Sequence, residues 1–391
     1  MPSSMWPCLF AVLTACGGES SKRPDATPDS FDRSALLAHL ATNHFLALHA
    51  ELETKTAVLA PRIGAYCDAL DAGTVGDTQT AARAVWAEAI DTWELLDAVL
   101  VGPAAMDNKV ARDRIYGWPL LSICGLDRDT ASRFADPGSY NITTKLSNVR
   151  SLAAVEFLLF STATMHGCAT TPVGWDALGA DLPRARCRLA QAIAADVHDG
   201  AVALHTAWRP DGGDYVGVLA RAGNGSSIKS AQEGANHISD GLFFADRVLK
   251  DMKLGEPAGI AANVCGTIQE PCVREVELQY GDRATFAIRA NLVALRRIFT
   301  GTLPATDGPG YDDFLRALGA TELADQMTAK LDDAIAKANA IPDSFLGALS
   351  TSYPSIVATH GAVKLFTDDL KSQFLTVLSL EIPDDVAADN D

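Results

Sequence analysis

The sequence lacks the short motifs that mark several common enzyme classes. It contains no H-E-x-x-H zinc helix, no G-x-S-x-G nucleophile turn, no P-loop and no glycine fingerprint for dinucleotides. Ordinary hydrolase and nucleotide-binding functions are therefore poor starting hypotheses. Alternating strand patterns are also scarce, whereas apolar residues recur at helical spacing along almost the whole chain. The pattern predicts an all-α protein.

Basic residues are few relative to acidic ones. The chain has 32 Lys and Arg residues against 49 Asp and Glu residues, a formal net charge of −17. Such a balance argues against binding to nucleic acid and against adhesion to anionic lipid. The acidic residues are scattered, which indicates a solvated surface.

A long hydrophobic run is also missing. Residues 1–15 form a short apolar segment, below the roughly 20 residues that a membrane-spanning helix needs. The segment ends in small residues before Cys16, a pattern typical of a bacterial lipoprotein signal in which Cys16 is acylated. We expect an exported protein that is lipid-anchored to the outer membrane on its periplasmic side, with residues 16–30 as a flexible tether. Because no Lys or Arg lies near Met1, a plain cleaved signal is the alternative.

No C-x-x-C spacing is present, so zinc is a weaker explanation for the cysteines than disulfides in an exported chain. Six cysteines lie beyond the signal: Cys67, Cys124, Cys168, Cys187, Cys265 and Cys272. Cys265 and Cys272 share one short loop and are the best candidate pair. Cys168 with Cys187 comes second, and Cys67 with Cys124 follows by elimination.

The apolar periodicity predicts long helices separated by Gly- and Pro-containing loops. Their expected ranges are 31–60, 78–101, 144–161, 183–208, 227–252, 283–300, 321–340 and 355–380. We expect two packed helical-bundle halves, residues 31–210 and 226–385. The segment 211–225 is rich in glycine and polar residues, so we expect a hinge or linker there.

One carboxylate, Glu156, sits in the apolar run L-A-A-V-E-F-L-L-F. A buried carboxylate needs a partner. Contact with a metal or ligand is one explanation, and a buried salt bridge to Arg114 or Arg150 is the other.

Three polar residues on a later segment follow a helical stripe. Glu233, His237 and Asp240 are spaced i, i+4 and i+7, so they share one face of a helix. Neighbouring members could chelate zinc, iron or copper, especially if the stripe faces Glu156. The alternative is a solvated polar face.

A loop that contains charged residues and a tryptophan, and a set of evenly spaced histidines, also stand out in the sequence. Asp113 and Arg114 lie in a loop followed by Trp118, and polar loop residues beside an aromatic ring often line a site, so we expect ligand contacts there. His39, His44 and His49 are spaced by five, which puts successive members about 140° apart on an α-helix. We expect these to be surface histidines.

Several of these segments resemble the imelysin-like family of exported bacterial proteins, once classed as metallopeptidases and later linked to iron uptake. The matching segments are W-x6-W-x-x-x-D running to G-P at Trp86–Pro103, D-R-I-x-x-W-P at Asp113–Pro119, A-V-E-F-L-L-F at Ala154–Phe160, D-M-K-L-G-E-P at Asp251–Pro257 and E-L-Q-Y-G-D-R at Glu277–Arg283. Their order and spacing hold across about residues 35–350.

The resemblance implies two helical halves with a site between them and a G-x-H-x-x-E signature that binds metal or catalyses. Glu156 occupies the Glu position, but Ala153 replaces the His and Ser151 the Gly. Asp97 stands where the family commonly has Glu, which makes it a candidate ligand contact. His237 from the other half is the candidate replacement imidazole. Without it, the pocket binds a ligand other than a metal, or the protein is only a scaffold.

We therefore expect a binding lipoprotein for a metal ion, such as iron, zinc or copper, or for a metal-bearing ligand, acting in metal acquisition. Its expected partners are periplasmic or outer-membrane transport proteins. A metallopeptidase is the first alternative, although zinc hydrolysis needs about three protein ligands and a bound water. A non-catalytic scaffold lipoprotein is the second.

Overall fold

The computed structural model describes residues 30–266 and 268–380, and in these ranges it contains helices and turns but no strand. The expected all-α class is confirmed. Cys16, the signal segment and the tether up to residue 29 lie outside the described residues, as do the last residues of the expected second half. No helix in the described part is long and apolar enough to cross a membrane.

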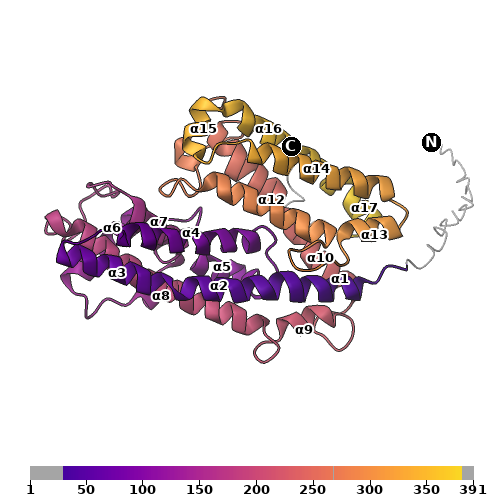
Figure 1. The fold of residues 1–391 in the computed structure, drawn as a ribbon, viewed down its shortest axis with the longest axis horizontal. Coiled ribbons are helices and arrows are strands. Elements are labelled where there is room, and N and C mark those ends of the chain that lie inside the picture. Colours follow the sequence, from indigo (N-terminus) through magenta and orange to yellow (C-terminus); the bar gives the residue numbers. More distant parts are fainter. Residues whose placement is uncertain (1–29, 267, 381–391) are drawn as a thin grey trace, which may run out of the picture. The chain divides into compact units, whose positions relative to one another are not determined.

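The first half contains the following helices: α1 (Arg33–Leu40), the π-helix η1 (Ala41–Leu46), α2 (Ala47–Ala57), α3 (Leu59–Ala72), α4 (Thr78–Asp97), α5 (Val110–Ile115), α6 (Ile123–Ala135), α7 (Leu152–Phe160) and α8 (Leu182–Trp208). Helix α9 (Tyr215–Ala220) follows in the segment 211–225. Helices α2, α3, α4 and α8 pack side by side (Figure 1). Short 3-10 turns connect several of them.

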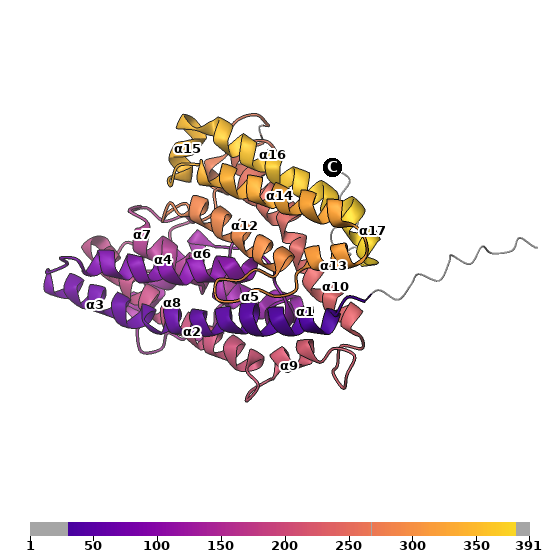
Figure 2. The same ribbon diagram turned by 45° about the vertical axis from the view of Figure 1, so that its right-hand side comes forward.

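The second half contains α10 (Ala231–Leu242), the π-helix η7 (Ala245–Gly255), α11 (Glu256–Ala258), α12 (Ala284–Thr300), α13 (Tyr311–Ala317), α14 (Thr321–Asn339), α15 (Phe345–Thr351), α16 (Tyr353–Asp369), the π-helix η9 (Leu370–Phe374) and α17 (Leu375–Leu378). Helix α14 packs on both α12 and α16, and α12 also packs on α4 of the first half (Figure 2).

Local chemistry sets many of the helix limits. Ser122, Ser151 and Ser230 precede α6, α7 and α10, and each side chain accepts a hydrogen bond from a backbone N–H in the first turn. Gly73 and Gly301 end α3 and α12 with φ of 67°, a conformation that glycine adopts at little cost.

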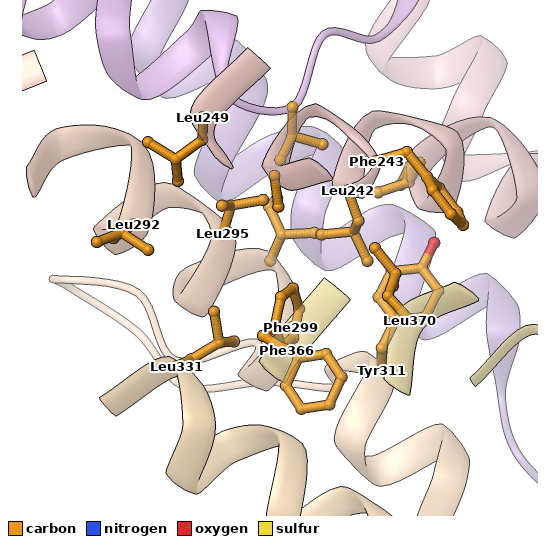
Figure 3. Close-up of a cluster of buried hydrophobic side chains, with 14 of the residues drawn as sticks. Leu242, Phe243, Leu249, Leu292, Leu295, Phe299, Tyr311, Leu331, Phe366 and Leu370 are labelled. Atoms are coloured by element: carbon orange, nitrogen blue, oxygen red, sulfur yellow. The ribbon is translucent and has the colours of Figure 1, made fainter. Parts of the chain in front are cut away.

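Two large hydrophobic cores result, and the second one draws on both ends of the chain. Figure 3 shows its centre, where Leu242, Leu295 and Phe299 meet Phe366 from α16. This core also includes residues of α1, η1 and α9, whereas α2 to α8 build the other core. The segment 211–225 thus carries α9, with Tyr215 buried against the second core. Its role as a hinge stays a prediction.

The three disulfides correct two of the expected pairings. Cys265–Cys272 is confirmed. The pairings Cys168–Cys187 and Cys67–Cys124 were wrong, because the bonds are Cys67–Cys187 and Cys124–Cys168. Helices α3 and α8 pack along each other, which places Cys67 opposite Cys187. Cys124 begins α6 beside the loop that carries Cys168. Such pairings follow from helix packing and cannot be reached by elimination.

The histidines spaced by five are buried rather than exposed. His39, His44 and His49 are 9%, 2% and 3% exposed. The π-helix η1 lies between the first and the last of them, and its i→i+5 hydrogen bonds bring residues five apart close to one face. The surface prediction assumed α-helical geometry throughout and was therefore wrong. Burial lowers the pKa of His44 and of His49 to about 3, so both rings are neutral at physiological pH.

Candidate functional site

A cleft of about 490 Å³ lies where the end of α4 and the segment from Ala105 to Pro119 face α10 and η7. Its lining residues are Asp97, Leu100, Ala105, Lys109, Arg112, Trp118, Pro119, Asp240, Gly241, Phe243, Phe244, Arg247, Val248 and Met252. Asp97, Trp118 and Asp240 had been singled out from the sequence, and the structure brings these three to one cleft.

A buried ion pair fixes the first-half wall of the cleft. Arg112 donates from Nε and Nη2 to the two carboxylate oxygens of Asp97, at 2.9 and 2.8 Å. Its Nη1 donates to the backbone oxygens of Tyr116 and Trp118 and to Asp113. Burial opposes ionisation of Asp97, but the attraction of the Arg112 guanidinium is stronger and holds the pKa of Asp97 below its usual range. Most of the N–H donors of Arg112 are therefore engaged in hydrogen bonds, and Arg112 positions Trp118.

The other two predicted loop residues do not line the cleft. Asp113 contacts Arg112, as described above. Arg114 donates to Asp196 at 2.9 Å, and Arg150 shares the same carboxylate at 2.6 Å. Arg114 thus joins helix α5, and not the expected loop, to α8, and Arg150 joins α8 to the segment before α7. Arg112 is one of the residues that the sequence did not reveal, although it lies one position before the Asp113–Arg114 pair.

A second polar group lies directly behind the cleft. Lys253 on η7 is 1% exposed, and its Nζ contacts Glu94 Oε2 at 2.6 Å, Glu277 Oε2 at 2.9 Å and Asn291 Oδ1 at 2.9 Å. Tyr116 donates its hydroxyl to Glu277 Oε1 at 2.7 Å. We call Glu94, Lys253, Glu277, Asn291 and Tyr116 the buried cluster. It joins helices and loops of both halves.

The buried cluster carries more acid than base. Burial raises the pKa of Glu94 to about 8, and repulsion from Glu277 adds to the effect, whereas Lys253 opposes it. Glu94 Oε1 is buried and has no hydrogen-bond partner within the described residues. Burial thus favours the protonated form of Glu94, and contact with Lys253 favours its carboxylate. The carboxylates in turn hold the pKa of Lys253 above its ordinary value despite its burial.

Two aromatic rings separate the buried cluster from the cleft. The ammonium of Lys253 lies 5.7 Å from the ring centroid of Trp118 and 5.4 Å from that of Phe244. Both rings line the cleft and Lys253 does not. The cation therefore acts on the cleft through these two aromatic side chains.

Glu156 is 2% exposed and is held by backbone groups of the other half. Its Oε1 accepts hydrogen bonds from the N–H of Tyr280 at 2.9 Å and of Gly281 at 2.8 Å. Of the two alternatives for Glu156, the salt bridge to Arg114 or Arg150 is wrong, because both arginines bind Asp196 instead. Burial raises the pKa of Glu156 to about 8, although the two N–H groups favour its ionised form. Glu156 thus fixes the loop that carries Glu277.

The expected metal ligands do not assemble in the described part of the chain. Glu233 accepts a hydrogen bond from the backbone of Lys229, while His237 and Asp240 are exposed on α10. Nowhere in residues 30–266 and 268–380 do three or more His, Cys, Asp and Glu side chains form a group that could hold a metal ion. The donor set available here therefore does not fit a metal held directly by the protein.

Comparisons with known proteins agree on the fold. A family model described as Imelysin matches residues 45–367. An imelysin-like protein from Psychrobacter arcticum 273-4 has a similar structure, with a TM-score of 0.67, 16% identity, and coverage of 90% of this chain and 96% of that one. A protein described as an iron-regulated protein A precursor, from Parabacteroides distasonis ATCC 8503, also has a similar structure. Its TM-score is 0.68 and its sequence identity is 17%, and the match covers 92% of this chain and 96% of that one. The comparison with curated proteins finds no match.

Proposed function

This chain belongs to the imelysin family, and we propose that it is an exported, lipid-anchored binding protein that takes a small metal-bearing ligand into the cleft. The observation that carries the proposal is the cleft itself. Its volume lies within the range of small-molecule sites, and its lining is largely apolar with a few fixed polar groups. The Asp97–Arg112 pair and the buried cluster hold the walls in place before any ligand arrives.

The metal is proposed to arrive as part of the ligand. A chelate brings its own donor atoms, so it does not require a set of three or more protein ligands. The name of the neighbour from Parabacteroides distasonis supports an iron context. Periplasmic or outer-membrane transport proteins remain the proposed partners. Nucleic acid is an unfavourable partner for a chain of net charge −17.

Peptidase activity gains no support from this geometry. Ala153 occupies the position of the family histidine, and its methyl group ligates no metal. Glu156 binds two backbone N–H groups, so its Oε1 is already engaged. A scaffold role without a ligand is the remaining alternative, and it predicts that nothing binds in the cleft.

Calorimetric titration tests the proposal. The probes are ferric ion alone, ferric citrate and ferric salicylate, added to the parent chain and to Ala105→Phe, which places a ring in the cleft. Ala84→Phe, at an exposed position of α4, is the matched control. We expect at least one chelate to bind the parent and the control but not Ala105→Phe. Equal binding to all three chains would overturn the assignment of the cleft as the ligand site. Cleavage of an unfolded protein that stops when a chelator is added would instead support the metallopeptidase alternative.

The anchor needs its own test. In a Gram-negative host, the parent chain is expected in the membrane fraction and labelled by a fatty-acid analogue. Cys16→Ser removes the acylated thiol and should lose the label. A labelled Cys16→Ser variant would contradict the lipoprotein assignment.

A further inference from the structure

The net charge of the side chains that line the cleft is opposite in sign to the net charge of the whole chain. Among its lining residues, Lys109, Arg112 and Arg247 outnumber Asp97 and Asp240, whereas the chain carries −17. Asp97 and Arg112 neutralise each other in their ion pair. The other three side chains leave one net positive charge, which favours an anionic ligand group.

Aromatic side chains form a second feature of the cleft. Trp118, Phe243 and Phe244 all line it, and Trp118 and Phe244 are half-buried. Phe243 and Phe244 are adjacent at the junction of α10 and η7. Trp118 faces them from the first half and is held by Arg112 through its backbone oxygen. Flat rings fixed on both walls favour a planar ligand that stacks on them.

Lys253 of the buried cluster makes two aromatic rings of the cleft less favourable for a cation. A ring attracts cations through the negative charge of its π-face. The ammonium of Lys253 already lies within 6 Å of the centroids of Trp118 and Phe244, and it lies outside the cleft. A cation held on one side of a ring makes the ring less attractive to a second cation. Because Glu94 and Glu277 contact the same ammonium, its charge is offset within the buried cluster, and the preference for an anion rests on the cleft lining.

We infer that the cleft takes a small planar aromatic ligand that carries a carboxylate or a similar anionic group. The inference rests on the proposed function, because it names the ligand class of the same cleft. Its anionic group lies on the side of Lys109, and its ring stacks between Trp118 and Phe244. An aromatic acid with a neighbouring hydroxyl also chelates ferric ion, which joins this ligand class to the proposed metal cargo.

Three matched probes test the ligand class: benzoate, cyclohexanecarboxylate and benzylamine. Benzoate shares its charge with the second probe and its ring with the third. We expect benzoate to bind about two- to tenfold more tightly than cyclohexanecarboxylate, the range that an aromatic pair contributes. Benzylamine is expected to bind more weakly than either. Trp118→Leu should remove the preference for the ring while cyclohexanecarboxylate affinity stays nearly constant.

A charge variant completes the test. Lys109→Ala should weaken benzoate by about two- to fivefold and leave benzyl alcohol unchanged, because only benzoate is charged. Lys229→Ala is the control, since Lys229 is exposed just before α10, whereas Asp240 lies near the other end of that helix. Both lysines are exposed, so neither change should affect folding.

The possible failures are distinguishable. Benzylamine binding as tightly as benzoate, or cyclohexanecarboxylate binding equally well, would overturn the ligand class. Ferric citrate binding in the cleft without competition from benzoate would also overturn it, but would leave the binding function standing. Failure of every probe to bind the cleft would overturn the proposed function and this inference with it.

Discussion

Glu156 offers a direct test of how the two halves are joined. Its Oε1 accepts two hydrogen bonds from Tyr280 and Gly281, and these bonds hold the loop that delivers Glu277 to Lys253. Glu156→Leu removes the acceptor and leaves both N–H groups without a partner. Glu156→Gln keeps an acceptor oxygen at the same place. The two variants therefore separate an acceptor role from a metal-ligand role.

The magnitude follows from the two hydrogen bonds. An unsatisfied buried N–H costs about 1–3 kcal/mol, and the lower half of this range applies because both groups are only partly buried. Glu156→Leu should therefore lower the free energy of unfolding by about 2–4 kcal/mol at pH 5. Glu156→Gln should change it by less than about 1 kcal/mol. Urea unfolding followed by tryptophan fluorescence measures both, and Glu322→Leu on the exposed face of α14 is the control.

The pH dependence of the same variants gives a second readout. In the unfolded chain Glu156 loses its proton near 4.5, and in the folded chain near 8, because burial raises its pKa. Between these values the folded state binds more protons than the unfolded state, so stability falls as pH rises. The slope is at most about 1.4 kcal/mol per pH unit. Glutamine does not titrate, so Glu156→Gln should gain stability over the parent from pH 5 to pH 8.

Two results would refute this reasoning. One is a Gln variant that loses as much stability as the Leu variant, because the acceptor oxygen would then not matter. The other is a difference between parent and Gln variant that stays constant from pH 5 to pH 8, because Glu156 would then not be buried as a neutral acid.

Three further changes have defined outcomes. Lys253→Met leaves two buried glutamates without their cation and should cost about 3–5 kcal/mol of stability at pH 8, less at pH 5, measured by urea unfolding. Gly281→Ala places a Cβ 2.9 Å from the Trp86 ring and should lower the melting temperature, whereas an unchanged value would contradict the packing. Replacing Cys67 and Cys187 together by alanine opens a link across 120 residues and should cost about 4 kcal/mol, again by urea unfolding; a cost below about 1 kcal/mol would count against this bond.

Helix positions were largely predictable because the 3.6-residue period is a local property. The ranges expected at 78–101, 183–208, 283–300 and 321–340 correspond closely to α4, α8, α12 and α14. The histidine prediction failed because a π-helix changes the period without any change in composition. The disulfide pairing failed because it depends on which helices pack together, and apolar periodicity does not specify that.

The candidate site was predictable only in part. Trp118, Asp97 and Asp240 were found from loop chemistry, family resemblance and helical spacing, and they share one cleft. Glu94 was missed, although it is a carboxylate between Trp93 and Leu95 and follows the same rule that singled out Glu156. Lys253 lies in the family-like segment D-M-K-L-G-E-P, but no local pattern indicated its role, because its partner Glu94 lies 159 residues away.

The most direct test of the account is whether a ligand contacts Trp118. Trp6 lies in the proposed signal, so the mature chain keeps five of the six tryptophans, and a sample labelled with 5-fluorotryptophan gives five fluorine resonances. Trp118→Phe identifies the one from the cleft. Titration with ferric salicylate or benzoate is expected to shift the Trp118 resonance most, and Ala105→Phe should abolish that shift. A resonance of Trp118 that stays fixed while ligand binds, or a shift centred on Trp86 or Trp208 in the cores, would contradict the central claim.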